Sequence, residues 1–483
     1  MNCEFQQFYE KNEKKLLNDI SNTIAFASVA GEADENGNPF GKEVSDCLNH
    51  ILHLGEEMGM KSKNIDNYIG EITIGTGKHM IGILCHADVV DAGGGWKTDP
   101  FQAVIQDGEL YGRGSIDDKG PMICCLYAMK YIQDNNLLPK ECRIRMIIGT
   151  DEEENWVSMD KYRNMNPEIP EVSIVPDANF PVISCEKGLI NLTMHIPVFW
   201  EAGAGLKILE LSGGERPNVV PTAAYCRIAI CNGTDPNDII AHIQTVADKN
   251  GIHLDTEIEQ DGILRISVTG KAAHAMTPEK GCNAISHMMK ILTELTLGES
   301  ADFVQKNVIR FYENYIGLEY NGDSLGINWS DDESGSLTLN VGVIDMTETE
   351  MKLILNIRYP VDRTFDEVRE KLQAVCEPLG ISLEFGVCMD PIYFDRNSQV
   401  VKALLDSYRK YTGDTESMPI ALGGATYARA IPNAVAFGPV FPNQEELAHE
   451  ANEHYTVSDF KRITEIYADA LLRLCKLSCS GEL

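Results

Sequence analysis

An almost unbroken apolar segment, HMIGILCHADVV at His79–Val90, limits the folds open to this chain more than any other stretch. A strand that is apolar on both faces belongs in a parallel sheet that helices cover from both sides. Similar strands are expected at Arg143–Gly149 and Val172–Val175. Between them the spacing of apolar residues predicts amphipathic helices at Glu13–Ser28, Val44–Met58 and Pro121–Gln133. Strands that alternate with helices predict an α/β layer sandwich.

The pattern changes near Gly188, where the strands begin to alternate apolar and polar residues. Such alternation predicts antiparallel strands with one face in water. From about Val387 the α/β pattern returns and ends in a helix expected at Val457–Lys476. We therefore expect a discontinuous α/β domain over 1–187 and 386–483, with an α+β domain inserted over 188–385.

The charge balance excludes several classes of partner. The chain has 41 Lys and Arg residues against 73 Asp and Glu residues, a net charge of −32. Such a surface repels phosphate backbones and acidic membranes, so neither nucleic acid nor a membrane is expected as a partner. No segment approaches the roughly 20 apolar residues of a membrane helix, and the polar start of the chain does not resemble a signal peptide.

The 14 cysteines are scattered and form no CxxC pair. In a chain of this length that usage is typical of reduced thiols in a cytoplasmic protein. The adjacent Cys124 and Cys125 lie in an apolar, helix-like stretch and are expected in the core.

Five clusters of acidic and histidine residues stand out, and four of them end strand-like segments, where open α/β sheets keep their sites. They are Cys85–Asp88, Tyr111–Pro121, Thr150–Glu154, Val175–Ala178 and Ala448–Glu453. Each alone is common in solvated loops. Together they supply two histidines and at least three carboxylates without a thiolate, a set that suits two cations such as Zn²⁺, Mn²⁺ or Co²⁺. Two cations that share a carboxylate indicate a bridging water and hydrolysis.

In this order the clusters resemble the pattern of the metallopeptidase family M20. The resemblance rests on HADVVDAGGGWKTDPF, LYGRGSIDDKGP, GTDEE, PDANFP and GKAAHAMTPEKGCNAI, and it covers nearly the whole chain. The CEKG, RPNVVP and GGATYAR segments look most like the PepV-type dipeptidases. The resemblance implies a catalytic α/β/α sandwich of the zinc-exopeptidase kind with an inserted α+β lid domain.

Carried over position by position, the resemblance implies five ligands of two divalent metals, most simply zinc: His86, Asp117, Glu153, Asp177 and His449. Asp117 would bridge the two metals, with a cis peptide after it at Asp117–Asp118. Asp88 would orient the ring of His86. Glu152 would be the general base, taking a proton from a metal-bridged water and later giving it to the leaving amine.

The resemblance also implies substrate contacts. His274 would stabilise the oxyanion, while Asn218 and Arg358 would bind substrate, with Arg358 placed to hold a C-terminal carboxylate bidentately. Gly424 and Thr426 in the GGATYAR segment are assigned to substrate binding, and that segment is expected in the catalytic domain. Closure of the lid over a fixed carboxylate anchor would favour dipeptides over longer peptides. A monomer fits the PepV-type resemblance, and a dimer stays open.

The favoured interpretation is a dipeptidase. An N-acyl-amino-acid deacylase or desuccinylase, or a narrow Xaa-His dipeptidase, would share every metal ligand and stays open as an alternative. A non-catalytic binding protein is disfavoured because no expected ligand or base is missing. A calcium-binding module is disfavoured because the chain lacks the D-x-[DN]-x-[DN]-G loop and the set includes histidines.

Overall fold

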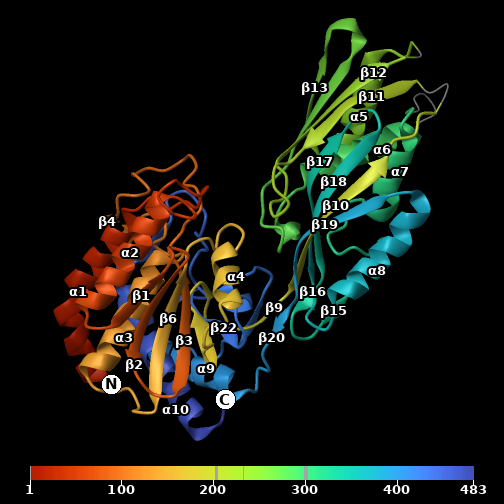
Figure 1. Ribbon diagram of the computed structural model, residues 1–483. Helices are drawn as coiled ribbons and strands as arrows, with labels where there is room; N and C mark the ends of the chain where they lie inside the picture. Colours follow the sequence, from red (N-terminus) through yellow and green to blue (C-terminus); the bar gives the residue numbers. More distant parts are fainter. Residues whose placement is uncertain (1, 202–204, 232, 298–302) are drawn as a thin grey trace. The chain divides into compact units, whose positions relative to one another are not determined.

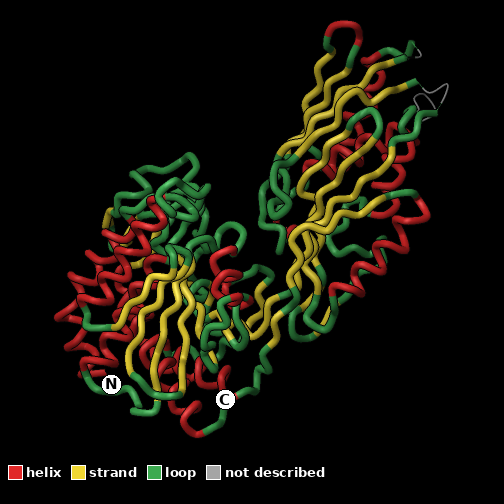
Figure 2. The backbone as a smooth tube through the Cα atoms, viewed as in Figure 1, coloured by secondary structure: helices red, strands yellow, loops and turns green. Residues whose placement is uncertain are grey.

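The computed structural model describes residues 2–201, 205–231, 233–297 and 303–483. The described chain divides into two compact units. Unit 1 comprises Met1–Ser184, Phe394–Ile420 and Ala425–Leu483, and unit 2 comprises Cys185–Tyr393 and Ala421–Gly424. Figures 1 and 2 show a mixed helix and strand content in both.

Unit 1 is built on a six-stranded sheet with the order β1-β2-β6-β3-β7-β22. The strands are β1 (Lys61–Ile65), β2 (Ile69–Gly75), β3 (His79–His86), β6 (Cys142–Gly149), β7 (Val172–Val175) and β22 (Ala434–Ala436). The four strands β6, β3, β7 and β22 run parallel, whereas β1 and β2 pair antiparallel. The carboxyl ends of the parallel strands therefore meet at one edge of the sheet.

Helices cover both faces of this sheet. The helices of unit 1 are α1 (Asn2–Ile24), α2 (Lys42–Glu57), α3 (Lys119–Asp134), α4 (Val157–Asn164), α9 (Gln399–Thr412) and α10 (Val457–Ser480). One face of the sheet packs into a core with α1, α2, α3, α9 and α10. Helix α4 contacts β2, and the 3-10 turn η4 (Tyr427–Arg429) contacts β3, β7 and β22. The prediction of a mixed α/β fold is confirmed.

Several expected boundaries are wrong, and two of them have a clear structural reason. The first helix was expected at Glu13–Ser28, but α1 begins at Asn2 because Phe5 and Tyr9 extend its buried stripe and Phe5 packs edge-on against Tyr131. The apolar strand expected at His79–Val90 ends at His86, since its partner β6 also ends there, at Gly149.

Unit 2 contains an eight-stranded sheet with the order β13-β14-β12-β11-β17-β18-β10-β19, antiparallel throughout. Its strands are β10 (Gly188–Pro197), β11 (Leu206–Gly213), β12 (Ala223–Ile230), β13 (His253–Ile258), β14 (Leu264–Thr269), β17 (Thr338–Met346), β18 (Glu350–Tyr359) and β19 (Ser382–Met389). Its helices are α5 (Pro236–Asn250), α6 (Ala284–Leu297), α7 (Lys306–Tyr315) and α8 (Phe365–Cys376). Along β12 buried and more exposed residues alternate, as expected for a sheet with one wet face.

Short strands complete the described elements: β4 (Val104–Gln106), β5 (Glu109–Tyr111), β8 (Ala178–Asn179), β9 (Ile183–Glu186), β15 (Ser330–Asp331), β16 (Gly335–Ser336), β20 (Ile392–Tyr393), β21 (Ile420–Leu422), β23 (Pro439–Val440) and β24 (His454–Thr456). No helix within the described ranges is both long and apolar enough to cross a membrane.

The unit boundaries differ from the expected domain boundaries at three places. Residues 185–187 group with unit 2, where Cys185 and Glu186 of β9 pair with β20. Residues 386–393 group with unit 2 because β19 continues to Met389 and pairs there with Leu189. Residues 421–424 also group with unit 2, although the GGATYAR segment was expected whole in the other domain. The cause is local, since Lys187 N–H donates to the carbonyl of Leu422 and Arg358 Nη1 donates to that of Gly423.

A buried carboxylate ties α9 to α10 and makes part of the stability of unit 1 dependent on pH. Asp469 accepts hydrogen bonds from Lys410, Arg473 and Ser407. Burial alone would raise the pKa of Asp469, but these three donors lower it. A lowered pKa stabilises the folded state above the unfolded value, near 4, and this stabilisation is lost as the pH falls through the folded value. We expect Asp469→Asn to cost about 1 kcal/mol at pH 7 and progressively less as the pH falls through the lowered pKa of Asp469, as measured by denaturant unfolding. A loss that does not change with pH would contradict this account.

Candidate metal centre

Two groups of side chains within the described residues could each hold a cation. One consists of His86, Asp117 and Asp177, and the other of Asp117, Glu153 and His449. Within each group the potential ligand atoms lie within 4.8 Å of one another. Asp117 belongs to both groups, so the structure brings together all five residues that the resemblance assigns as ligands.

The topology of unit 1 explains why these side chains meet. His86 is the last residue of β3, and the neighbouring strands β6 and β7 run parallel to it. Glu153 follows the end of β6 and Asp177 follows the end of β7. Asp117 comes from the loop before α3, and His449 comes from the loop before β24. The peptide bond Asp117–Asp118 is cis, as the resemblance implies.

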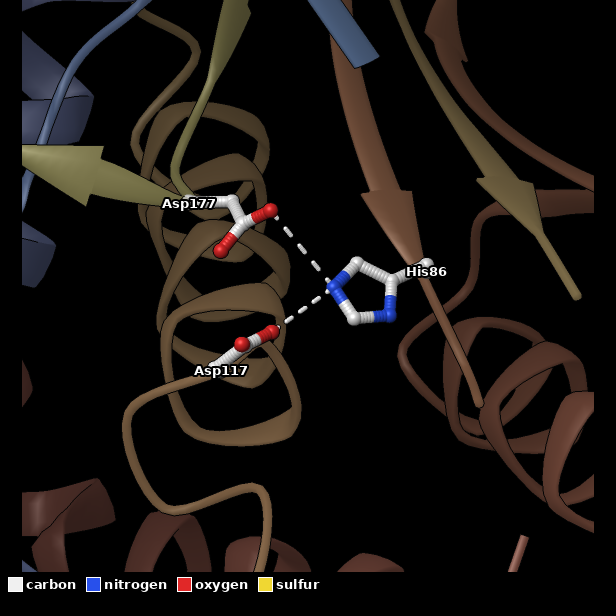
Figure 3. A group of neighbouring side chains, drawn as sticks. All are labelled: His86, Asp117 and Asp177. Carbon is white, nitrogen blue, oxygen red and sulfur yellow. Dashed lines mark ion pairs between the residues drawn. The ribbon is translucent and has the colours of Figure 1, made fainter. Parts of the chain in front are cut away.

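The two oxygens of Asp117 face two different histidines. Asp117 Oδ1 lies 2.9 Å from His86 Nε2, and Asp117 Oδ2 lies 2.9 Å from His449 Nε2. Asp177 Oδ2 lies 3.6 Å from His86 Nε2 on the first side, as drawn in Figure 3. Glu153 Oε2 lies 3.1 Å from His449 Nε2 on the second. A carboxylate shared in this way is the geometry of a bridging ligand.

The second ring nitrogen of His86 defines its tautomer. His86 Nδ1 lies 3.0 Å from the backbone carbonyl of Asp88, to which it donates, while the Asp88 carboxylate is 3.5 Å away. Asp88 Oδ2 instead accepts the backbone N–H of Glu153 at 3.1 Å. Asp88 thus contacts one ligand of each group, and its closest contact with His86 is through the main chain.

The arrangement of donors and acceptors fits a cation. With its proton on Nδ1, His86 presents the lone pair of Nε2 to the carboxylates of Asp117 and Asp177. His86 Nε2 and Asp117 Oδ1 are buried and make no well-directed hydrogen bond to any described residue. Where Nε2 carries no proton, acceptors that face one another at 2.9 Å repel unless a cation lies between them. Nitrogen and carboxylate oxygen are the ligands that zinc and similar divalent cations take.

The electrostatics of the protein alone also favour a cation. Burial and the charge of Asp117, against the opposing effect of His449, raise the pKa of Glu153 to about 7. Burial and Asp117 likewise raise the pKa of Asp177. Although burial opposes the charged form of His449, the carboxylates of Glu153 and Asp117 raise its pKa strongly. The carboxylates therefore repel one another, and positive charge at this place relieves the repulsion.

Glu152 belongs to neither ligand group, yet the charges of both groups change the pKa of its carboxyl. Burial raises its pKa well above the usual value, and the charges of Asp177, Glu153 and Asp117 add to this while His86 opposes it. Its backbone carbonyl accepts a hydrogen bond of 2.6 Å from Trp156 Nε1, which fixes the turn after β6. A carboxyl near a cation site and not bound in it is placed to accept a proton.

A buried ion pair supports the centre and was missed in the sequence. Arg113 and Glu453 are almost fully buried, and Arg113 Nη1 lies 2.8 Å from Glu453 Oε2. Glu453 Oε1 accepts the backbone N–H groups of Gly114 and Ile116 and, at 3.4 Å, that of Asp117. Arg113 Nη2 donates to the carbonyl of His449. The pair therefore holds both loops that carry Asp117 and His449.

Removing the charge of Glu453 is expected to weaken both the fold and the centre. The Glu453→Gln variant leaves Arg113 buried without its counter-ion, which costs about 3 kcal/mol. Because the two supported loops carry ligands, we also expect a 10- to 100-fold loss of metal affinity. Thermal unfolding and metal titration of the variant measure the two effects. Glu450→Gln, at an exposed neighbouring position, is the control and should change neither; unaltered stability of Glu453→Gln would contradict the role of the pair.

A second supporting network lies under the turn after β6. Asp151 accepts hydrogen bonds from the backbone N–H groups of Val157 and Ser158 and from the Ser158 hydroxyl. The Ser158 hydroxyl is 3.3 Å from that of Tyr427, which is buried. A Cβ added to Gly149 would lie 2.2 Å from the Tyr427 hydroxyl, so glycine is needed where β6 passes this ring. No spacing rule in the sequence points to this network.

In unit 2 the structure brings His274, predicted to stabilise the oxyanion, next to Asn218, a predicted substrate-binding residue. Asn218 and His274 lie on adjacent segments, since Ala275 N–H donates to the carbonyl of Asn218 and Val219 pairs with His274. Both side chains are exposed. His274 Nδ1 accepts the backbone N–H of Met276. Nearby, the buried Asn340, which the sequence did not mark, donates from its amide to the carbonyls of Pro217 and Val219.

The other three predicted substrate-binding residues lie around the GGATYAR segment. Arg358 is buried in β18, with Nε donating to Asn356 and Nη1 to the carbonyl of Gly423. This second hydrogen bond links Gly423, the residue before Gly424, to β18 of unit 2. Thr426 belongs to unit 1, where its hydroxyl accepts the N–H of Ala428 and begins the turn η4.

Comparison with known proteins agrees with this geometry. The model of peptidase family M20/M25/M40 matches residues 82–473. A Staphylococcus epidermidis protein named "Putative dipeptidase" is 33% identical over 467 residues, which cover 96% of this chain and 97% of that protein.

Two solved structures share the fold across nearly the whole chain. Human carnosine dipeptidase 1 matches with a TM-score of 0.57 at 14% identity, covering 99% of this chain and 100% of that one. The M20 family metallo-carboxypeptidase Sso-CP2 from Sulfolobus solfataricus matches with a TM-score of 0.57 at 18% identity, covering 96% and 99%. The resemblance predicted from the five motifs is confirmed, and the chain belongs to peptidase family M20/M25/M40, as a hydrolase of peptide bonds.

Proposed function

We propose that this peptidase is a dinuclear-metal dipeptidase of the PepV kind. The observation that carries the proposal is the shared carboxylate, because each oxygen of Asp117 lies 2.9 Å from the Nε2 of a different histidine. Two neighbouring cation positions follow from it. The dipeptide preference is supported by the CEKG, RPNVVP and GGATYAR segments and by the names of the relative from S. epidermidis and of the human structure.

The proposed centre uses five protein ligands. His86 and Asp177 would hold one cation, Glu153 and His449 the other, and Asp117 both. When bound, two such cations polarise the scissile carbonyl and lower the pKa of a water between them. The nitrogen and oxygen donors suit zinc best, and manganese or cobalt also fits the set.

The proposed chemistry of the chain itself centres on Glu152. Its carboxylate would take a proton from the attacking water and deliver that proton to the leaving amine. Burial and neighbouring negative charge raise its pKa, which makes it a better base than an ordinary glutamate. Asp88 would keep the proton of His86 on Nδ1 and hold the backbone of Glu153 in place.

The substrate contacts rest on the motifs. We propose that His274 stabilises the oxyanion and that Asn218, Arg358, Gly424 and Thr426 bind the substrate, within a catalytic domain and an inserted lid. A carboxylate anchor at a fixed position would limit substrates to two residues. A monomeric state and a cytoplasmic location likewise stay predictions from the sequence.

A substrate panel tests the proposed function. The zinc-loaded protein is incubated with Ala-His, Leu-Gly, a tripeptide, an N-acetyl amino acid and N-succinyl-diaminopimelate, and released amino acid is measured. We expect cleavage of both free dipeptides and little of the rest. Cleavage of the acylated compounds alone would make the protein a deacylase with the same metal ligands. Cleavage of Ala-His alone would indicate the narrow Xaa-His dipeptidase.

A further inference from the structure

Three thiols that the proposed catalysis does not use lie close together in unit 1, where β6 begins and α10 ends. Cys142 is the first residue of β6, and the last residue of that strand, Gly149, precedes the turn that carries Glu152 and Glu153. Seven residue steps of a strand separate the two ends by roughly 23 Å. Cys475 and Cys479 lie one helical turn apart near the end of α10. Cys142 is therefore remote from the metal centre, which lies beyond the other end of the same strand.

Two of these sulfurs are in direct contact. Cys142 Sγ and Cys479 Sγ are 3.1 Å apart, and Cys142 Sγ also lies 3.4 Å from the carbonyl of Cys475. A disulfide has an S–S distance of about 2.05 Å, so the two sulfurs lie about 1 Å beyond bonding distance. This contact brings together residues that are 337 positions apart in the sequence.

The surroundings hold the pair together and leave one sulfur accessible. Ser478, next to Cys479, donates its hydroxyl to Glu171 Oε2, and the other oxygen of Glu171 lies 3.0 Å from His79 Nδ1. These contacts fasten the end of α10 beside β3 and β6. Cys142 is buried, whereas Cys479 is exposed. An oxidant from solvent therefore reaches Cys479 first, with Cys142 behind it.

We propose that Cys142 and Cys479 form an oxidation site, in which a hydroperoxide converts the two thiols to a disulfide that fastens α10 to β6. In the first step the Cys479 sulfur attacks one peroxide oxygen, the O–O bond breaks, and Cys479 sulfenic acid and water form. In the second step the Cys142 sulfur attacks the sulfenic sulfur and expels hydroxide, which leaves as water with the Cys142 proton. Two thiols and one hydrogen peroxide thus give one disulfide and two waters.

The order of the steps agrees with the protonation of Cys142. Burial and the neighbouring Cys479 together raise the pKa of Cys142 to about 12. A protonated, buried thiol reacts slowly with peroxide. Cys142 acts instead as the thiol that resolves a sulfenic acid already formed 3.1 Å away.

The disulfide is expected to stabilise unit 1 against unfolding and to leave the peptidase activity unchanged. The cross-link closes a very long loop of the unfolded chain, which is the case in which a disulfide stabilises most in the chain-entropy model. The melting temperature of unit 1 should rise by on the order of 5 °C. Peptidase activity should stay within twofold, because neither cysteine contacts a ligand of the metal centre.

The experiment compares the zinc-loaded protein before and after treatment with hydrogen peroxide. Free thiols are then alkylated, and a non-reducing digest is analysed by mass spectrometry for the peptide pair that contains Cys142 and Cys479. Thermal unfolding is measured on the same samples, with and without dithiothreitol. Cys479→Ser changes an exposed residue and should abolish both the cross-link and the thermal shift. Cys388→Ser, at an exposed cysteine of unit 2, is the matched control and should keep both.

Each outcome decides the proposal. A Cys142–Cys479 peptide pair that dithiothreitol removes, with a thermal shift absent from Cys479→Ser, supports it. A cross-link between Cys142 and Cys475, or oxidation of Cys479 to sulfinic acid without a cross-link, overturns the assignment of the pair. A thermal shift that persists in Cys479→Ser overturns the stabilising role.

Discussion

The Glu152→Ala variant is expected to lose about 10²- to 10⁴-fold in kcat on a dipeptide while it keeps its metal content. The side chain belongs to neither ligand group, yet the charges of both act on it. Its removal therefore deletes a proton acceptor and leaves the ligands in place. The measurement combines steady-state kinetics with metal analysis by mass spectrometry on the same preparation.

A neighbouring carboxylate provides the control for Glu152. Glu154 lies two residues further along the same acidic run but is exposed, so Glu154→Gln should retain near-normal kcat. If Glu152→Ala instead lost metal in proportion to activity, Glu152 would be a ligand and the base would lie elsewhere. Retention of more than a tenth of the activity would also contradict the role.

The Asp117→Asn variant should lose both metals, because one carboxylate contributes an oxygen to each group. Activity should fall below detection, since without this shared negative charge the remaining ligands cannot offset the repulsion between two neighbouring cations. Variants that touch only one group provide the comparison. Asp177→Asn should weaken the binding of one cation and Glu153→Gln the binding of the other. Each of these two variants should therefore retain about one metal per chain at limiting metal concentration.

Metal stoichiometry measured by isothermal titration distinguishes these variants. The shared-carboxylate arrangement predicts about two cations in the wild type, one in each single-group variant and none in Asp117→Asn. Two independent sites would instead leave one cation bound to Asp117→Asn. That result would exclude a bridged pair even if the enzyme remained a peptidase.

Much of the centre could be predicted because the ligands come from short motifs at the ends of strands. His86, Glu153 and Asp177 follow three adjacent parallel strands, and such ends meet in any sheet of this kind. Asp117 and His449 come from loops, where the sequence marked the clusters but only the resemblance assigned these two residues as ligands. The sequence marked the right residue types there but not their partners.

The supporting residues could not be predicted for a physical reason. Arg113 and Glu453 are 340 positions apart, and charged residues in loops are normally solvated. Only the folded chain shows that both are buried and that they pair. The one available signal was that Glu453 stands in the same polar cluster as His449, four residues further on. Similarly, the grouping of 421–424 with unit 2 depends on a contact of Arg358 with a main-chain carbonyl.

The order in which the chain is synthesised has a consequence for when the enzyme can become active. Unit 2 is almost entirely one continuous segment, whereas the sheet of unit 1 is completed by β22, at Ala434–Ala436, which pairs with β7, at Val172–Val175. His449 and the counter-ion of Arg113 come later still, just before α10. A nascent chain on the ribosome carries Asp117 and Glu152 long before it carries the residues that complete their surroundings. The proposed centre therefore stays incomplete until synthesis has passed Glu453.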